Sequence, residues 1–596
     1  MPWILAVILQ ASLGYRVCSG ATTSYDYVVV GAGTCGLLLA NRLSHDPALT
    51  VAVIDPGPDQ RSNTLINDPA AFIRLFQEPG VSWGYRSVPQ AGAGGRVLDY
   101  RAGKGIGGSS LINGMTYIRG DEAQFDAWED LGNPGWNWNE LLRYYKKLER
   151  LFYPEPWQVE LGASVRSEFH GFNGQLRVGF PPNLENTSFY QDAKDSWGKL
   201  GLGLNRDVNS GATRGFDVWP QTIDPKLNQR WDSATSFFWP VAGRPNLHLI
   251  NGTVERILWK GTSKGEEDAE ASGVEYLTPN HGCRRIYASR EVILSAGALR
   301  TPLILERSGV GDTRLLKKLG ITPIVDLPGV GENLIDQPNS PLMFKAKNKF
   351  LGSSPYAAFA TARDLFGPKV SEVAAQTKRS LGQWARHMAQ SRGGGAETVT
   401  ALERIFRIQH ALIFDKHVTL AEILTTAYGE VIGSAAWNLL PFSRGSVHIQ
   451  AGTDGYVSDM PAIDPQFMAV DFDLAAQVAA GRLAARLWKS APVRDLVGGN
   501  LQPPNGSEMP TPDATEGQWR NWTAGVFVSN SHPIGTAAMM ARELGGVVDP
   551  KLAVYGTRKL RVVDASVLPM QFSGHLTATL YAVAEKAARM MLEDTR

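Results

Sequence analysis

The hydrophobic pattern near the start of the chain places an amphipathic segment between two short apolar runs. Residues 25–30, YDYVVV, and 50–55, TVAVID, have the length and composition of buried strands. Between them, residues 37–46, LLLANRLSHD, carry apolar side chains at helical spacing. This order predicts a strand–turn–helix–strand unit of the kind that opens an α/β domain.

Farther along the chain, the hydrophobic pattern is typical of strands in some segments and of helices in others. Residues 174–180, 445–450 and 461–467 read as strands or turns, whereas residues 357–366 and 474–490 look helical. Residues 390–399, QSRGGGAETV, read as a linker or loop. A strand that ends at Asp564 and a helix that begins near Leu576 close the sequence. We find no internal repeat.

Composition and charge narrow the classes of function. The chain has 596 residues, of which 43% are hydrophobic and 20% charged, so it can bury a large core. Its 59 basic and 58 acidic residues give a net charge of +1, without a basic stripe. Nucleic acid and anionic membranes are therefore poor candidates as partners.

The N-terminus indicates export. Residues 1–20 contain an apolar run followed by small residues, as in a secretory signal peptide, although a buried N-terminal strand is the alternative. The location expected is secreted, or the lumen of the secretory pathway or vacuole. With only three cysteines, one of them inside this segment, we expect no structural disulfide. N-glycans are expected at some of four sequons: Asn186, Asn251, Asn505 and Asn521.

A glycine loop follows the first predicted strand. In GAGTCG, Gly31 permits a tight turn, Gly33 lets a pyrophosphate approach the backbone, and Gly36 lets helix and strand pack closely. Asp55, at the end of the next strand, can accept hydrogen bonds from an adenosine ribose. The context predicts dinucleotide binding, and it leaves NAD and FAD both open.

A second glycine-rich stretch, residues 103–126, has the sequence GKGIGGSSLINGMTYIRGDEAQFD, and residues 297–311 read GALRTPLILERSGVG. These stretches resemble the two signature sequences of the glucose–methanol–choline (GMC) oxidoreductase family. Further motifs, such as GVGENLIDQP and PFSRGSVHI, extend the resemblance from about Ser24 to Glu593. It is least distinct between about residues 345 and 430.

The resemblance implies an α/β plus α+β fold in which a discontinuous, Rossmann-like FAD-binding domain accompanies a substrate domain of antiparallel sheet and helices. The FAD domain would comprise residues 24–150, 225–330 and 525–596, and the substrate domain residues 151–224 and 331–524. The FAD is expected to be non-covalent, because residues 103–126 contain no histidine that could tether it. The resemblance places FAD contacts at Gly31, Gly33, Thr34, Cys35, Gly36, Asp55, Pro56, Asn113, Gly114, Met115, Thr116, Val254, Asp564, Ala565, Leu576 and Thr577.

Two histidines carry the predicted chemistry. His532 and His575 match the two active-site positions of family members such as glucose oxidase and aryl-alcohol oxidase. Oxidation of an alcohol removes a hydride from carbon and a proton from oxygen, and a neutral imidazole suits the second task. We expect His532 to act as the base and His575 to bind the substrate oxygen. No His/Cys pattern predicts a metal site.

These features predict a secreted alcohol oxidase or dehydrogenase with a small-molecule alcohol as substrate, oxygen or a quinone as acceptor, and a role in fungal secondary metabolism similar to that of patulin synthase. The resemblance leaves a homodimer open. A non-redox cyclase on the same scaffold, similar to versicolorin B synthase, and a silent binding protein are the alternatives. Local departures from the family pattern occur at Asp55, usually Glu, at Gln175, usually Pro, and at Gln337, usually His.

Overall fold

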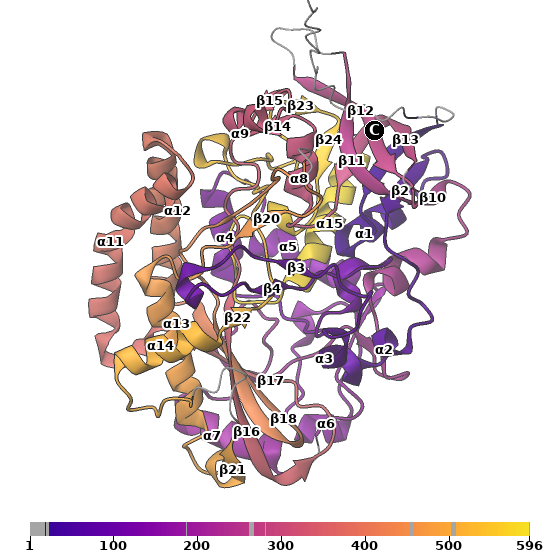
Figure 1. Cartoon of the computed structure of the whole chain (residues 1–596). Helices are drawn as coiled ribbons and strands as arrows, with labels where there is room; N and C mark the ends of the chain where they lie inside the picture. The colour runs from indigo at the N-terminus through magenta and orange to yellow at the C-terminus, as the bar shows by residue number, and fades with distance from the viewer. Residues whose placement is uncertain are drawn as a thin grey trace, which may run out of the picture.

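Two β-sheets and the helices packed on them organise the structure, a computed structural model (Figure 1). It describes residue 18 and residues 23–185, 187–261, 268–280, 282–452, 457–501 and 508–594. Apart from Cys18, the predicted signal peptide at 1–20 lies outside the described residues, as do the sequons at Asn186 and Asn505.

The first sheet is parallel at its centre, and strands β10, β2, β1 and β13 lie in that order, with β24 beside β13. Strands β12 and β11 extend the sheet in antiparallel orientation, and β23 joins β12. The bounds are β1 Thr23–Val30, β2 Val51–Asp55, β10 Leu247–Asn251, β11 Thr253–Lys260, β12 Ala269–Leu277, β13 Cys283–Leu294, β23 Thr557–Arg558 and β24 Leu560–Val562. Three distant stretches of the chain therefore build one sheet, and the predicted α/β class is confirmed.

Helix α1, Thr34–Leu43, follows β1 directly, as the sequence pattern predicts. Its Leu37, Leu38 and Leu39 are fully buried, and the helix packs on α15, Leu576–Glu593. Because apolar residues cover most of its surface, α1 is buried among other elements rather than on the surface. This packing brings the N-terminus of α15, and with it His575, toward the glycine loop that precedes α1.

The second sheet is antiparallel, with strand order β21, β16, β18, β17 and β7, and β22 also pairs with β16. Helix α13 packs on β16 and β18, α14 packs on α13, and α11 and α12 form a pair at the left of Figure 1. The bounds are β7 Gly215–Val218, β16 Pro338–Phe350, β17 Tyr356–Thr361, β18 Thr419–Asn438, β21 Val497–Asn500, β22 Val528–Ser529, α11 Val370–Ser391, α12 Ala396–Phe414, α13 Asp471–Leu487 and α14 Glu516–Val526. The predicted α+β part is thus present.

Some of the helices and strands predicted from the sequence are confirmed, and one helix is not. Residues 474–490 are confirmed as mostly helical, in α13, and the glycines of 390–399 make the turn between α11 and α12. The predicted strands correspond to β6 Leu176–Val178, β19 Ser446–His448 and β20 Ala462–Asp464. The helix predicted at 357–366 is wrong over its first half, which forms β17, and only α10, Ala362–Phe366, is helical. Every residue of β17 is buried, so the segment lacks the alternation that distinguishes a half-exposed strand.

The remaining elements are short or peripheral. The helices are α2 Thr64–Asn67, α3 Phe72–Leu75, α4 Glu122–Asp130, α5 Trp138–Leu148, α6 Pro156–Glu160, α7 Phe189–Lys199, α8 Thr301–Arg307 and α9 Thr313–Lys318. The strands are β3 Tyr85–Arg86, β4 Asp99–Tyr100, β5 Glu149–Leu151, β8 Ile223–Asp224, β9 Gln229–Arg230, β14 Val310–Gly311 and β15 Val325–Asp326. Within the described ranges, we find no helix with the length and apolar character needed to cross a bilayer.

The cysteines do not follow the sequence prediction. Cys18 and Cys283 form a disulfide with their Cα atoms 4.5 Å apart, so the expectation of no structural disulfide is wrong. Cys35 is a buried free thiol. The prediction failed because it treated Cys18 as part of a segment that is removed.

Candidate active site

A cavity of about 640 Å³ lies at the carboxyl ends of β1, β2 and β13, which is where open α/β sheets bind ligands. Residues from both glycine-rich loops, from the His532 loop and from the start of α15 line it. All predicted FAD contacts line this cavity except Gly36 and Met115. Gly36 packs inside α1, and Met115 is buried with its backbone at a φ of 61°.

The three glycines of the first loop have different surroundings. Gly31 has a φ of 110°, and a Cβ atom at Gly36 would lie 2.0 Å from the Gly31 carbonyl oxygen. At Gly33, by contrast, the nearest heavy atom to an added Cβ would be 3.9 Å away. The backbone conformation at Gly31 and the close packing at Gly36 therefore require glycine, whether or not a ligand is bound. Gly33 leaves open space next to the cavity, as close approach of a phosphate demands.

The second loop packs against the first, backbone to backbone. Gly108 has a φ of 55°, and a Cβ there would lie 2.7 Å from the Cα of Gly33. Asn113 donates from Nδ2 to Thr577 Oγ1 over 3.1 Å, and the buried Arg230 donates from Nη1 to Asn113 Oδ1 over 2.7 Å. These contacts hold the polar Asn113 turn against the N-terminus of α15.

Two acidic residues stabilise the loops around the cavity. The carboxylate of Asp55 accepts hydrogen bonds from the backbone N–H groups of Ala32, at 2.8 Å, and Gly57, at 2.6 Å. Asp564 likewise accepts from the N–H groups of Gly297 and Ser566, at 2.9 and 2.8 Å. Burial raises the pKa of both carboxyl groups. Asp55 thus fixes the glycine loop and still lines the cavity, where a ribose can bind.

His532 and His575 meet at this cavity although they are distant in sequence. Their ring centroids are 5.3 Å apart, and the ring planes are nearly perpendicular, at 83°. His575 is the N-cap residue of α15, and its backbone N–H donates to the Ile118 carbonyl over 2.9 Å. Both side chains line the same space as the glycine loops. A ligand bound along those loops therefore reaches the histidine pair.

The surroundings of His532 keep its ring neutral. Burial, together with the nearby His575, lowers the pKa of His532 to about 3. The backbone N–H of His532 donates to Asp336 Oδ1 over 2.9 Å, and its carbonyl accepts from Gln571 Nε2 over 2.7 Å. Main-chain contacts on both sides fix the loop that carries the ring. A neutral imidazole can accept a proton throughout the neutral pH range.

His575 has a partner that the sequence interpretation missed. Its Nε2 lies 3.0 Å from Oε1 of Glu422, whose side chain is fully buried on β18. The ring of Trp437 also meets the His575 ring edge to face, with centroids 6.1 Å apart. Glu422 belongs to the region where the family resemblance is weakest. The one available signal was an acidic residue inside the apolar run TLAEILTT, which indicates a buried and therefore paired charge.

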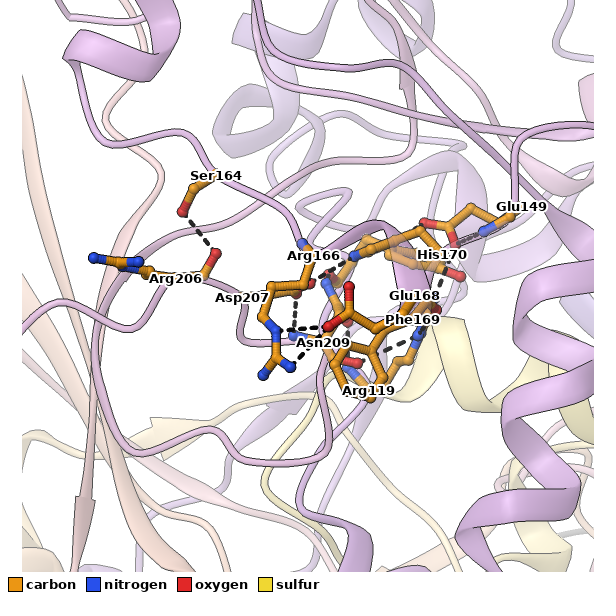
Figure 2. Close-up of polar contacts among 12 residues, drawn as sticks. Arg119, Glu149, Ser164, Arg166, Glu168, Phe169, His170, Arg206, Asp207 and Asn209 are labelled. Carbon is orange, nitrogen blue, oxygen red and sulfur yellow. Dashed lines mark hydrogen bonds and ion pairs between the residues drawn. The ribbon is translucent and has the colours of Figure 1, made fainter.

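A buried ionic cluster (Figure 2) adjoins Ile118, whose carbonyl accepts the hydrogen bond from the His575 N–H. Arg119 follows Ile118, and its Nη2 pairs with Glu149 Oε2 at 2.8 Å. His170 bridges Glu149 and Asp207, with contacts of 2.9 and 3.0 Å. The Arg119 backbone N–H also donates to Asn209 Oδ1 over 3.0 Å. The cluster therefore fixes the backbone segment that accepts the His575 N–H.

Comparison with known proteins decides the family. Two family models, both described as GMC oxidoreductase, match residues 25–339 and 441–584. The chain belongs to the GMC oxidoreductases. In this GMC oxidoreductase, as in the family, the cofactor is FAD, and the cavity geometry around Gly33 and Asp55 fits it.

Curated relatives and solved structures agree with this assignment. The chain is 48% identical over 589 residues to the glucose oxidase-like protein fsoC of Humicola fuscoatra, covering 99% of each chain. It is 34% identical to a glucose oxidase of Penicillium chrysogenum, covering 96% of this chain and 92% of the relative.

Among structures, an FAD-dependent oxidoreductase from Chaetomium thermophilum superposes with a TM-score of 0.87 and 28% identity, over 96% of this chain and all of the other. A fungal aryl-alcohol oxidase gives a TM-score of 0.83 and 25% identity, with the same coverage. This GMC oxidoreductase is thus an FAD-dependent enzyme of the alcohol oxidase and dehydrogenase type. These relatives give no support to the cyclase alternative.

Proposed function

We propose that this GMC oxidoreductase oxidises a small-molecule alcohol, with His532 as the base that takes the hydroxyl proton. The observation that supports the proposal is the meeting of His532 and His575 at the cavity that the glycine loops line. The residues that line the cavity would hold FAD, whose N5 atom would supply the acceptor for the hydride of the carbinol carbon. The protein supplies the proton acceptor and the geometry.

The two histidines have different partners, which supports a division of roles. His575 contacts the Glu422 carboxylate through Nε2, and this contact orients its ring at the cavity where the substrate oxygen would bind. His532 has no carboxylate within hydrogen-bond distance of its ring in the described part of the chain, and its low pKa keeps it unprotonated. A neutral proton acceptor and a second, oriented imidazole are thus available for one hydroxyl group.

Anaerobic spectroscopy of the purified holoenzyme tests this function. Sugars, benzylic alcohols and lactol-type metabolites are mixed with the protein without oxygen, and bleaching of the flavin absorbance identifies the substrate class. The His532→Ala variant should keep its FAD and lose about 10²–10⁴-fold in the rate of bleaching, the range for a general base. His387→Ala, which changes an exposed histidine on α11, is the matched control.

The outcomes separate the alternatives. Bleaching of His532→Ala at the wild-type rate would refute the base role. A wild-type protein that holds FAD and binds alcohols without bleaching would show that the site is not redox-active toward them.

We infer further properties from the family and its relatives. The oxidases among the relatives favour oxygen as the electron acceptor, with a quinone as the alternative. The FAD is non-covalent, so acid precipitation should release it into the supernatant. The family resemblance of the sequence motivates a substrate from fungal secondary metabolism, and size-exclusion chromatography would test for a homodimer.

Export is proposed on the N-terminal pattern and the disulfide, because structural disulfides persist in oxidising compartments. Of the sequons within the described residues, Asn521 is exposed and suits glycosylation, whereas the exposed Asn251 lines the cofactor cavity and suits it less. Cleavage beside Gly20 would remove Cys18 and the disulfide, so we place the cleavage before residue 18. Mass spectrometry of the secreted N-terminus tests this position.

A further inference from the structure

Gln337 contacts the ring of His532 without lining the cavity. Its side chain is buried, and its Oε1 lies 2.8 Å from His532 Nδ1. Its own Nε2 donates to the Leu439 carbonyl over 3.1 Å, which fixes the orientation of the amide. The oxygen of Gln337, and not its nitrogen, therefore faces the imidazole.

An amide oxygen only accepts hydrogen bonds, so His532 Nδ1 must carry the hydrogen in this contact. In a neutral imidazole the other nitrogen, Nε2, then has the free lone pair. Within the described ranges, His532 Nε2 has no hydrogen-bond partner in the protein, and the side chain lines the cavity. The proton acceptor is thus available on the substrate side.

We propose that Gln337 is a positioning residue that holds His532 in the Nδ1–H tautomer, so that Nε2 accepts the proton of the substrate hydroxyl. This inference rests on the proposed function, because it specifies how the base of that reaction is prepared. Gln337 is also a position where the chain departs from the histidine usual in the family pattern.

Asn530 is the competing neighbour. Its Nδ2 lies 3.1 Å from His532 Nδ1 and 3.4 Å from Gln337 Oε1, so it could donate to either atom. Its Oδ1 accepts from Asn339 Nδ2 over 3.0 Å, which holds the amide nitrogen on the Gln337 side. An amide oxygen has two lone pairs, so Gln337 Oε1 can accept from both the ring and Asn530. The Nδ1–H tautomer satisfies all three groups, whereas the other tautomer leaves Gln337 Oε1 facing a lone pair.

The neutrality of Gln337 matters as much as its geometry. A carboxylate at this position would favour the charged imidazolium. The amide orients the ring without stabilising its charged form, so the base remains unprotonated until substrate arrives.

The chemical step balances with this assignment. The O–H bond of the alcohol breaks and its proton forms an N–H bond at His532 Nε2. The C–H bonding pair leaves with its hydrogen as a hydride to bound FAD. The product is a carbonyl compound, and the ring becomes an imidazolium until its proton is released.

Two variants separate positioning from folding. Gln337→Met keeps the length of the side chain but removes the acceptor, and Gln337→Glu keeps the acceptor and adds a negative charge. In both, FAD content and melting temperature are measured first. Anaerobic rapid mixing with D-glucose or 4-methoxybenzyl alcohol, whichever reduces the wild type, then gives the bleaching rate against pH.

We expect Gln337→Met to bleach about 10–100-fold more slowly, by analogy with the loss of a residue that orients a metal-bound histidine. Gln337→Glu should move the acidic limb of the rate profile upward by about 1–3 pH units, because an adjacent opposite charge stabilises the imidazolium. It should recover most of its rate above that limb. A merely structural role for Gln337 would not move the limb.

A second readout does not depend on activity. With ring-¹⁵N-labelled histidine, NMR distinguishes protonated from unprotonated ring nitrogens, and the His532→Gln variant identifies the His532 signals. The wild type should show a protonated Nδ1, and Gln337→Met should show loss of that pattern. Gln571→Met is the matched control, because Gln571 donates to the main-chain carbonyls of His532 and Ile335 and has no contact with the His532 ring, so the ring pattern should stay intact.

The results also separate this inference from the function on which it rests. If Gln337→Met keeps the wild-type rate, pH profile and ring signals while His532→Ala is inactive, the positioning role is overturned and the base role stands. If His532→Ala bleaches at the full rate, the proposed function itself fails.

Discussion

Asp336 precedes Gln337 and shows how one buried carboxyl group can hold a reactive loop. Its Oδ1 accepts from the backbone N–H groups of Gln337, at 2.8 Å, and His532, at 2.9 Å, and Oδ2 accepts from Ser529 Oγ at 2.5 Å. Burial raises the pKa of Asp336 from 3.8 to about 6. Adjacent residues of one segment therefore hold the backbone and the ring of the same histidine.

The raised pKa makes a prediction about stability. A group whose pKa is higher in the folded state stabilises the fold fully below its unfolded value, here 3.8, and loses that contribution as pH rises through about 6. Asp336→Asn removes the charge but keeps an oxygen that accepts both N–H groups. We expect the variant to match the wild type at pH 4 and to be more stable at pH 8, by about 3 kcal/mol at most.

Thermal unfolding at both pH values measures this difference. Asp415→Asn, at an exposed position before β18, is the control and should show no comparable gain. An Asp336→Asn protein that is less stable than the wild type at pH 8 would show that the ionised carboxylate is needed to hold the loop.

At the scale of elements, the β1–α1–β2 unit was predictable and the site partners on β18 were not. Residues near in sequence build the glycine loop, so Gly31, Gly33 and Gly36 indicate both the turn and its purpose. Glu422 reaches His575 only because β18 pairs in the second sheet, and that pairing joins residues far apart along the chain. Strand β17 was predicted as a helix because both of its faces are buried in the second sheet, so its sequence lacks the alternation of apolar and polar residues.

The first loop also supplies a test in which folding and cofactor binding separate. Gly33 has φ −93° and ψ −161°, which an alanine can adopt, and its nearest neighbour would lie 3.9 Å from the new Cβ. Gly33→Ala should therefore fold normally as apoprotein. Because the methyl group occupies the space through which a phosphate approaches, FAD should bind about 10–100-fold more weakly, as expected from an overpacking cost of about 1–3 kcal/mol.

Titration of the apoprotein with FAD, followed by flavin fluorescence, gives the affinity, and the melting temperature of the apoprotein reports on folding. Gly203→Ala, where an added Cβ meets nothing within 4 Å, serves as the control. Unchanged FAD affinity in Gly33→Ala would place the pyrophosphate elsewhere in the cavity.

Across the whole molecule, two histidines each bridge carboxylates from segments distant in sequence. His170 joins Glu149 to Asp207 (Figure 2), and His448 contacts Glu306 at 2.6 Å and Glu332 at 3.1 Å. Burial alone would lower the pKa of each histidine, but the paired carboxylates outweigh it. The pKa of His170 is raised above 6.5, and that of His448 is raised to about 10.

Both histidine clusters stabilise the folded protein more at low pH than at high pH. Each protonated histidine contributes fully below its unfolded pKa of 6.5, and the contribution falls as pH rises through the raised folded value. The pKa of Asp207 is lowered despite burial, mainly by His170, so its contribution is present above 3.8 and is lost as pH falls further. Together with the Asp336 contribution, which is lost as pH rises through about 6, these shifts place the highest melting temperature near about pH 4–5, with a decline toward pH 10.

The histidine variants test this origin of the pH dependence. His448→Asn leaves the buried carboxyl group of Glu306 without a cation, whereas the partly exposed Glu332 keeps Arg392 at 3.2 Å. The loss should cost about 3–5 kcal/mol at pH 6, the range for breaking a buried pair. The cost should shrink toward pH 10, because the wild type loses the same interaction there. His45→Asn, at an exposed position after α1, should lower the melting temperature little at either pH. If His448→Asn lowers it equally at pH 6 and pH 10, the side chain stabilises by packing, and its charge is not the cause of the acid-side maximum.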